Sequence, residues 1–330
     1  MNRLSRIAGT GICVPERVVT NFDLEKLMDT SDQWIRERTG IAERRFVEPG
    51  VGSSDLALGA SLMALENAGK RPEDVDFIIF ATLSPEYPFP GSGCLLQAKL
   101  GINDIGALDV RNQCSGFIYG LSVADQYVRT GMYRCVLVVG AEVQSIGLNL
   151  STAGRDTAVL FGDGAGAVVL TPSDGESGVL STHLHADGRY AKELWMEHPG
   201  CLRRPRLTPE MLTDGSMDPK MNGRAVFKHA VVRFCEAIEE ALRANHLDIE
   251  QVSLIIPHQA NLRITEAVAE RFGGMEKVYS NIHKYGNTTA ASIPIALHEA
   301  VCEGRIRPGD YVVLVAFGSG FTWASAVVRW

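Results

Sequence analysis

Hydrophobic residues along this chain alternate between helical spacing and short unbroken apolar runs. Residues 54–69, SDLALGASLMALENAG, place apolar side chains at helical spacing and end on glycine, and residues 75–83, VDFIIFATL, form the continuous β-rich run typical of a buried parallel strand. The same two signals return at residues 231–248, VVRFCEAIEEALRANHLD, and at residues 249–260, IEQVSLIIPHQA. The pattern therefore predicts an α/β protein in which one βα arrangement occurs twice.

A second pair of segments extends this duplication. Residues 107–142 predict a strand, a turn, a helix, a glycine stop and a strand, and residues 277–320 predict the same order. We predict an N-terminal half at residues 1–172, a C-terminal half at residues 225–330 and, between them at 173–224, a long surface excursion. Loops of that length in compact domains are often functional.

Three chemically useful side chains fall near strand ends of the two halves, and two of them, Cys114 and Asn287, occupy equivalent points. Cys114 stands between a strand and a helix start, Asn287 stands in the matching turn of the second half, and His258 ends the strand SLIIPH. Open α/β sheets bind ligands beyond the carboxyl ends of their strands, so the three can converge. A helix start favours thiolate and lowers a thiol pKa. Taken singly, each residue has an ordinary alternative: a buried core cysteine, a satisfied core histidine and a helix N-cap.

Composition narrows the function classes. The chain has 330 residues, 45% of them hydrophobic, and a formal net charge of -7, so we expect neither nucleic acid nor an anionic membrane as a partner. No apolar run is long enough for a membrane helix and the first residues lack a signal-peptide pattern, so we expect a cytoplasmic protein. The seven cysteines are scattered without a CxxC pair, which favours reduced thiols and no metal.

Three further motifs carry weaker signals. His183 and His185 could hold a metal, but no ligand set completes the site, so a polar strand edge is the better interpretation. The strings GTGICVP and FGDGAGAVVL resemble parts of a dinucleotide fingerprint without its strand, helix and acidic residue, and we interpret them as tight turns. Trp34 lies near Arg36 and Arg38, a combination that can stack an adenine ring and hold phosphate. An exposed basic helix is the alternative, and composition alone does not separate the two.

Seven motifs in order along nearly the whole chain resemble the β-ketoacyl-(acyl carrier protein) synthase III family of the thiolase-like superfamily. They are TSDQWIRERTGI, QCSGFIYGL, FGDGAGAVVL, MNGRAVFKHAV, PHQANLR, GNTTAASIP and AFGSGFTWASAVVRW. The resemblance implies a duplicated five-layer αβαβα fold, a homodimer and a catalytic triad of Cys114, His258 and Asn287. It also implies a decarboxylative condensation of an acyl-CoA primer with malonyl-acyl carrier protein through an acyl-cysteine.

Further roles are implied by the resemblance alone. Coenzyme A thioesters are expected as substrates, with no resident cofactor. Backbone N–H groups of Cys114 and Ser319 would form the oxyanion hole, and Phe89 would reach the acyl pocket of the partner subunit. Coenzyme A would be held by Trp34, Arg38, Arg155 and Asn261, and the carrier protein would dock on Lys228 and Arg263.

The chain also departs from the family pattern. It has Arg111, Asn112 and Gln113 where small residues are usual, Ser319 where glycine is usual, and a longer excursion at residues 190–221. We therefore expect a primer that is not simply acetyl. The alternative within the family is an acyltransferase that moves the acyl group from Cys114 to a small acceptor without decarboxylation; a nicotinamide oxidoreductase and a non-catalytic scaffold are the other classes considered.

Overall fold

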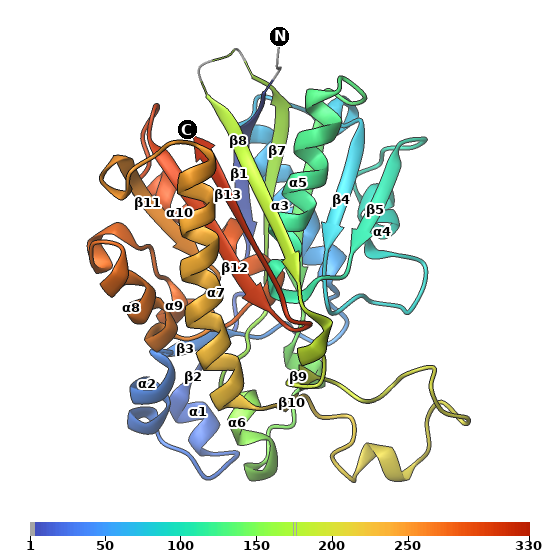
Figure 1. Ribbon diagram of the computed structural model, residues 1–330. Helices are drawn as coiled ribbons and strands as arrows, with labels where there is room; N and C mark the ends of the chain where they lie inside the picture. Colours follow the sequence, from blue (N-terminus) through green and yellow to red (C-terminus); the bar gives the residue numbers. More distant parts are fainter. Residues whose placement is uncertain (1–3, 174, 176) are drawn as a thin grey trace.

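Two mixed β-sheets form the centre of the molecule (Figure 1). The computed structural model describes residues 4–173, 175 and 177–330. In the first sheet the strand order is β1-β7-β6-β4-β5; β4 is parallel to β5 and β6, and β7 is antiparallel to β1 and β6. Its strands are β1 (Ser5–Cys13), β4 (Phe77–Ala81), β5 (Gly106–Val110), β6 (Val136–Glu142) and β7 (Gly164–Pro172).

The second sheet repeats the first. Its order is β11-β12-β13-β8, so β8, β13, β12 and β11 take the places of β1, β7, β6 and β4. Where β5 would be repeated there is a single parallel bridge between Ile255 and Val278. The strands are β8 (Gly178–Ala186), β11 (Val252–Pro257), β12 (Tyr311–Gly318) and β13 (Thr322–Arg329). The predicted duplication is therefore confirmed, and β8 falls within residues 173–224 that we had assigned to a connection.

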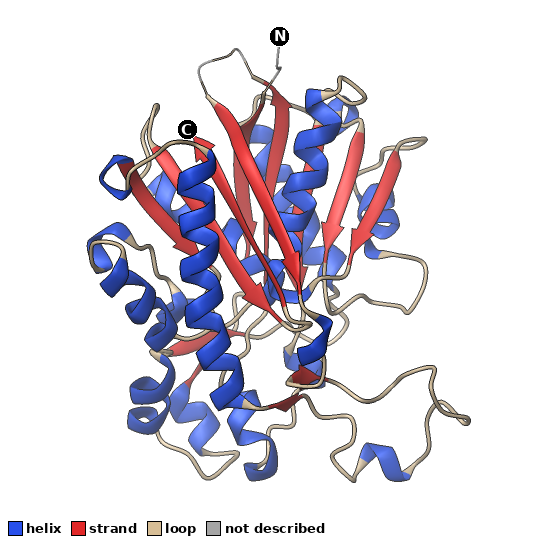
Figure 2. Ribbon diagram, viewed as in Figure 1, coloured by secondary structure: helices blue, strands red, loops and turns tan. Residues whose placement is uncertain are grey.

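Helices form the other layers (Figure 2). Helices α5 (Gly116–Arg129) and α10 (Ser292–Cys302) pack between the two sheets. Helices α3 (Ser53–Asn67) and α4 (Ser92–Lys99) cover the outer face of the first sheet, and α7 (Gly223–Ala244) and α8 (Leu262–Arg271) cover that of the second. The layers run helix, sheet, helix, sheet, helix, as predicted for a thiolase-like fold.

Burial explains why these segments take their places. All five residues of β4 are buried, as expected for a strand with helices on both faces. Helix α10 is buried around nearly its whole circumference, because it is covered by both sheets.

Two glycines that we had placed in a tight turn belong instead to a strand. Gly9 and Gly11 lie in β1, where a Cβ on Gly9 would come within 2.4 Å of the Ala64 carbonyl oxygen of α3. The absence of a side chain therefore lets the strand and the helix approach closely, and the tight-turn interpretation of GTGICVP is wrong.

Shorter elements gather at the lower end of the molecule in Figure 1, near the carboxyl ends of the parallel strands. Strands β9 and β10 pair Leu194 with Met221 and Trp195 with Lys220, and residues 196–219 between them extend away from the body. No helix among the described residues is long and apolar enough to cross a bilayer. The shorter elements at this end are α1 (Asn21–Glu25), α2 (Asp32–Thr39), β2 (Val18–Thr20), β3 (Glu43–Arg45), α6 (Arg155–Ala158), β9 (Leu194–Trp195), β10 (Lys220–Met221) and α9 (Ile282–Tyr285).

Candidate active site

A cavity of about 730 Å³ opens at the carboxyl ends of the strands and brings residues of both halves together. Cys114, His258 and Asn287 all line it, and each is less than a tenth exposed. Trp34, Arg38, Asn261 and Arg263 line the same cavity. The structure thus places seven of the predicted site residues around one space, although they come from segments far apart in the sequence.

Cys114 lies in a single 3₁₀ turn, Gln113–Ser115, directly before α5. Gln113 has a φ of 44°, in the left-handed region that non-glycine residues seldom adopt. The Ser115 hydroxyl donates to the Asn112 carbonyl oxygen at 2.9 Å and bonds the Thr322 hydroxyl at 2.7 Å. These contacts hold the strained turn against the end of β12 and the start of β13.

Burial governs the ionisation of the thiol. It raises the pKa of Cys114 to about 12, and the nearby carboxylate of Glu142 raises it further. We had expected the helix start to lower this pKa, and that expectation is wrong for the free enzyme because desolvation outweighs the helix start. A thiol of this kind needs a base to become nucleophilic.

His258 can act as that base. It follows β11 and is 2% exposed, and burial lowers its pKa to about 3, so the ring is neutral. Its Nδ1 lies 2.6 Å from the Ser292 Oγ, whereas its buried Nε2 has no hydrogen-bond partner within the described chain. Because His258 lines the cavity and its Nδ1 is occupied, Nε2 is the ring nitrogen available for chemistry.

Ser292 controls which form of Nε2 is presented. Its hydroxyl lies 3.0 Å from the Thr289 carbonyl oxygen as well as 2.6 Å from Nδ1 of His258. When the hydroxyl donates to Thr289, it accepts from an Nδ1–H and leaves a lone pair on Nε2. When it donates to Nδ1, the proton is on Nε2 and that nitrogen becomes a donor. Sequence analysis missed Ser292, although it stands within the GNTTAASIP motif.

Asn287 is fixed by its neighbours, and no hydrogen bond among the described residues involves its amide nitrogen. The Thr289 N–H donates to Asn287 Oδ1 at 2.9 Å, and the backbone of Asn287 pairs with Leu160 at 2.8 Å and with Gly162 at 3.1 Å. The oxygen is thereby occupied, so the NH₂ group is the part of the amide that remains for a ligand.

Trp34 forms a cationic stacking site at the cavity wall. The guanidinium carbon of Arg38 lies 4.6 Å from the Trp34 ring centroid, and that of Arg155 lies 4.9 Å from it. Asn261 donates to the Arg38 carbonyl oxygen at 2.9 Å and caps α8 by accepting from the Arg263 N–H at 3.0 Å. An aromatic ring with two guanidinium groups matches the chemistry of an adenine with phosphates.

The other predicted residues lie outside the cavity lining. Lys228 is exposed on α7, next to Phe227, which lines the cavity. Phe89 is 84% exposed, and Ser319 directly follows Gly318, with its hydroxyl donating to the Leu194 carbonyl oxygen. A Cβ on Gly318 would lie 2.9 Å from the Cys114 Cβ, so the 318–319 backbone passes right beside the thiol residue. The roles assigned to all these residues stay predictions.

The two histidines of β8 contact a carboxylate. His185 Nε2 lies 2.6 Å and His183 Nδ1 lies 3.5 Å from the Glu240 carboxylate of α7. Within the described residues, no group of three or more His, Cys, Asp or Glu side chains is arranged to hold a metal. The pair therefore links β8 to α7 rather than facing the cavity.

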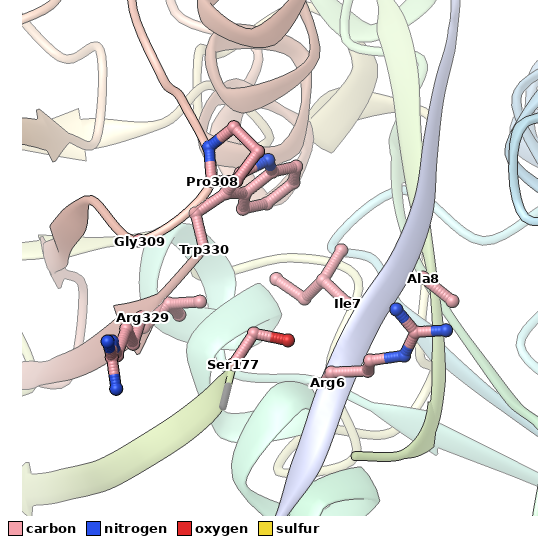
Figure 3. Close-up of a pocket in the computed structure, with 9 residues that line it drawn as sticks. Arg6, Ile7, Ala8, Ser177, Pro308, Gly309, Arg329 and Trp330 are labelled. Carbon is pink, nitrogen blue, oxygen red and sulfur yellow. The ribbon is translucent and has the colours of Figure 1, made fainter. Parts of the chain in front are cut away.

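A second cavity, of about 500 Å³, lies near the two chain ends (Figure 3). Its lining includes Arg6, Ile7, Arg329 and Trp330 but none of the predicted site residues. The two ends are at the top of Figure 1, whereas the elements around the Cys114 cavity lie at the bottom. This second cavity is therefore separate from the candidate active site.

Comparison with known proteins agrees with the geometry. Two family models match: 3-oxoacyl-[acyl-carrier-protein (ACP)] synthase III at residues 108–188 and its C-terminal model at residues 242–330. The chain is 48% identical to the beta-ketoacyl-[acyl-carrier-protein] synthase III of Roseiflexus sp. (strain RS-1), covering 100% of this chain and 99% of the relative. It is 49% identical to that of Caldanaerobacter subterraneus subsp. tengcongensis, covering 98% and 97%.

A solved structure agrees over the same length. The crystal structure of 3-oxoacyl-[acyl-carrier-protein] synthase III from Aquifex aeolicus VF5 superposes with a TM-score of 0.91 at 44% identity, covering 99% of this chain and 100% of that one. The chain therefore belongs to the β-ketoacyl-[acyl-carrier-protein] synthase III family.

Proposed function

We propose that the protein catalyses the decarboxylative Claisen condensation of an acyl-CoA primer with malonyl-acyl carrier protein, giving a β-ketoacyl thioester. The observation that supports this most strongly is the buried set of Cys114, His258 and Asn287 around one cavity. The names of its relatives point to the same reaction. The enzyme is accordingly an acyltransferase of the condensing type, and coenzyme A thioesters are substrates rather than cofactors.

The first half-reaction loads the acyl group. His258 Nε2 takes the Cys114 proton, and the thiolate attacks the thioester carbonyl. The new carbon–sulfur bond replaces the bond to coenzyme A, which leaves as a thiol with the proton returned from His258. Backbone N–H groups of Cys114 and Ser319 would bind the oxyanion. The close packing of Gly318 on Cys114 supports this role, because it keeps the two backbone segments adjacent.

The second half-reaction uses the same residues as donors. Malonyl-carrier loses carbon dioxide, and the electron pair of the broken bond forms an enolate. An Nε2–H on His258 and the free NH₂ of Asn287 would stabilise the enolate oxygen. The enolate carbon then attacks the acyl-Cys114 carbonyl, the carbon–sulfur bond breaks, and the Cys114 thiolate leaves. One proton from solvent restores the thiol, which is the proton that the overall reaction consumes. The Ser292 hydroxyl supports both halves, since it lets His258 present either a lone pair or a proton.

Partners follow from the surface around the cavity. Lys228 and Arg263 would dock the acidic carrier protein, which explains how a chain of net charge -7 can bind an acidic partner through a local basic cluster. The exposed Phe89 supports a homodimer, because an aromatic side chain left 84% exposed in one subunit is available to enter the partner's acyl pocket.

Removal of the Trp34 ring tests the coenzyme A site. We expect Trp34→Ala to raise the KM for acyl-CoA roughly tenfold, because two cation–π contacts and the stacking surface are lost, and to leave kcat little changed. Steady-state kinetics over a range of acyl-CoA concentrations measures both constants. Trp323→Ala is the matched control, since Arg233 lies 4.6 Å over that ring away from the cavity lining. An equal KM in wild type and Trp34→Ala would rule out this binding role.

A primer panel tests the reaction itself. Enzyme is incubated with a series of acyl-CoAs of different length and branching together with malonyl-acyl carrier protein labelled at the free carboxyl. We expect carbon dioxide release that depends on the acyl-CoA and is fastest with a primer other than acetyl-CoA. Acyl transfer without carbon dioxide release would favour the acyltransferase alternative, and a profile limited to acetyl-CoA would refute our expectation for the primer.

A further inference from the structure

Behind the nucleophile lies a carboxylate to which the reaction assigns no role. Glu142 is the last residue of β6 and is wholly buried. Its strand neighbours in VLVVGAE are apolar or glycine, so the carboxylate is the one ionisable group at the end of a hydrophobic strand. A charge in such a place is costly unless it is well hydrogen-bonded, so its retention calls for a function.

The carboxylate is satisfied by hydrogen bonds rather than by a cation. Donors to it come from the end of β4, from the exit of β6 and from the turn after Asn287, and no basic side chain of the described residues forms an ion pair with it. The shortest bond is from the Ser84 hydroxyl, at 2.6 Å. The other donors are Leu83 N at 3.1 Å, Ser84 N at 3.2 Å, Thr82 Oγ1 at 3.3 Å, Gln144 Nε2 at 3.4 Å and Ala290 N at 3.4 Å.

One arm of this network ends at Asn287. Thr289 has a φ of 48°, an unfavourable left-handed conformation for a β-branched residue. Its N–H nevertheless holds Asn287 Oδ1, and Gln144 Nε2 donates to its hydroxyl at 3.1 Å. Because Glu142 receives bonds from both Gln144 and Ala290, it stabilises the strained turn on each side of Thr289.

The other arm acts on Cys114 through charge. Glu142 is the carboxylate whose field raises the pKa of the thiol. The other ionisable residues that line the cavity with Cys114 are His258, Arg38, Asp156, Arg224 and Arg263. Asp163, which accepts from the Gln144 N–H at 2.6 Å, is a further carboxylate joined to this network. Packing keeps the parts together, since a Cβ on Gly116 would touch Ala81 at 3.3 Å and Ala290 at 3.7 Å.

We propose that Glu142 is a positioning residue that holds the Asn287 turn and keeps Cys114 in its thiol form until a substrate and His258 together remove the proton. The proposal rests on the proposed roles of Cys114 and Asn287. Burial raises the pKa of Glu142 itself to about 7 against the lowering effect of its hydrogen bonds, so its charge changes within the working pH range. The Glu142 carboxyl and the Cys114 thiol are coupled, because ionisation of either one disfavours ionisation of the other.

Alkylation of Cys114 as a function of pH tests the electrostatic arm. Glu142→Gln removes the charge and keeps the shape, so the thiolate becomes easier to form. We expect the profile of iodoacetamide modification, followed by peptide mapping of Cys114, to move to lower pH by about one unit. Glu142→Asp, which retains a carboxylate, should move less. A loosened fold would also relieve the burial of the thiol and move the profile to lower pH, so the melting temperature of each variant is measured beside it. The shift is assigned to the charge where the melting temperature is that of the wild type.

Carbon dioxide release tests the positioning arm in the same variants. We expect Glu142→Gln to slow decarboxylation more than acyl loading. The NH₂ of the new amide would face N–H and O–H groups that donate to the carboxylate, so those hydrogen bonds are lost and the Asn287 turn is released. Glu86→Gln is the matched control: Glu86 accepts from the Ser92 hydroxyl at 2.6 Å and from the Ser54 N–H at 2.6 Å at the same end of the sheet, without contributing to the pKa of Cys114.

The outcomes separate this proposal from the proposed function. Suppose that the wild type releases carbon dioxide and that Glu142→Gln folds but keeps the wild-type alkylation profile. This result would overturn the role of Glu142 and leave the proposed function intact. A wild-type enzyme that gains no acyl group on Cys114 from any acyl-CoA would overturn the proposed function instead. The exposed Cys94, Cys201 and Cys302 are open to alkylation in every variant, and peptide mapping separates them from Cys114. Should Glu142→Gln fail to fold, Ser84→Ala is the second variant. It removes the donor of the shortest hydrogen bond to Glu142 and so favours the protonated carboxyl. The alkylation profile of Cys114 should again move to lower pH, and an unchanged profile would overturn the proposal.

Discussion

Replacing Cys114 with alanine is expected to lower turnover about 10,000-fold or more, because no other described residue in the cavity can form the acyl thioester. The measurement is formation of the β-ketoacyl thioester from acyl-CoA and malonyl-acyl carrier protein, because His258 and Asn287 can promote loss of carbon dioxide without the nucleophile. Cys135→Ala is the matched control, since Cys135 is also buried and has a raised pKa but belongs to the core between the first sheet and α3. Retained turnover in Cys114→Ala would contradict the assignment of the nucleophile.

Replacing His258 and Asn287 should separate the two half-reactions. His258→Ala removes both the base and a donor, so we expect acyl loading and carbon dioxide release each to fall by roughly 100-fold to 10,000-fold. Asn287→Ala removes only a donor to the enolate, so carbon dioxide release should fall by roughly 100-fold to 1,000-fold while acyl loading stays near the wild-type rate. Single-turnover measurement of each step distinguishes the variants.

Equal losses in both steps would contradict this division of labour. If Asn287→Ala slowed acyl loading as much as carbon dioxide release, the amide would be acting on the first thioester as well, or the variant would have displaced the Thr289 turn. The melting temperature of Asn287→Ala decides between these outcomes: an unchanged value assigns the loss to the amide, and a lowered value assigns it to the displaced turn.

The duplicated fold could be predicted from the sequence because its buried strands are continuous apolar runs. FIIFA in β4 and LII in β11 are fully buried, and each strand is followed by a helix, α4 after β4 and α8 after β11. The polar alternation around His183 and His185 indicates a strand edge, but it does not show that β8 pairs with β13 in the second sheet, so the strand falls in the predicted connection. Likewise the expected strand near Val278 is reduced to one bridge, since a backbone pairing depends on where the neighbouring strand lies and not on local apolarity.

The site was accessible for a different reason. Carboxyl ends of strands in an α/β fold lie at one edge, so the positions of Cys114, His258 and Asn287 relative to their strands indicated that they would meet. The supporting residues gave no such signal. Ser292 contacts His258 across 34 positions of sequence, and Glu142 contacts Ala290 across 148, so their roles appear only once the two halves are packed.

Thiol ionisation could not be predicted from position alone. A cysteine before a helix was expected to have a lowered pKa, yet desolvation and the Glu142 carboxylate raise it. Burial of both Cys114 and His258 makes the neutral pair the resting state, and substrate entry must accompany proton transfer.

The account depends most directly on an acyl group carried by Cys114, and intact-protein mass spectrometry measures this. Enzyme incubated with acyl-CoA and no malonyl-carrier should gain the mass of one acyl group less one hydrogen, peptide mapping should place it on Cys114, and Cys114→Ala should gain nothing. A mass gain that persists in Cys114→Ala, or that maps to any other residue, would contradict the account.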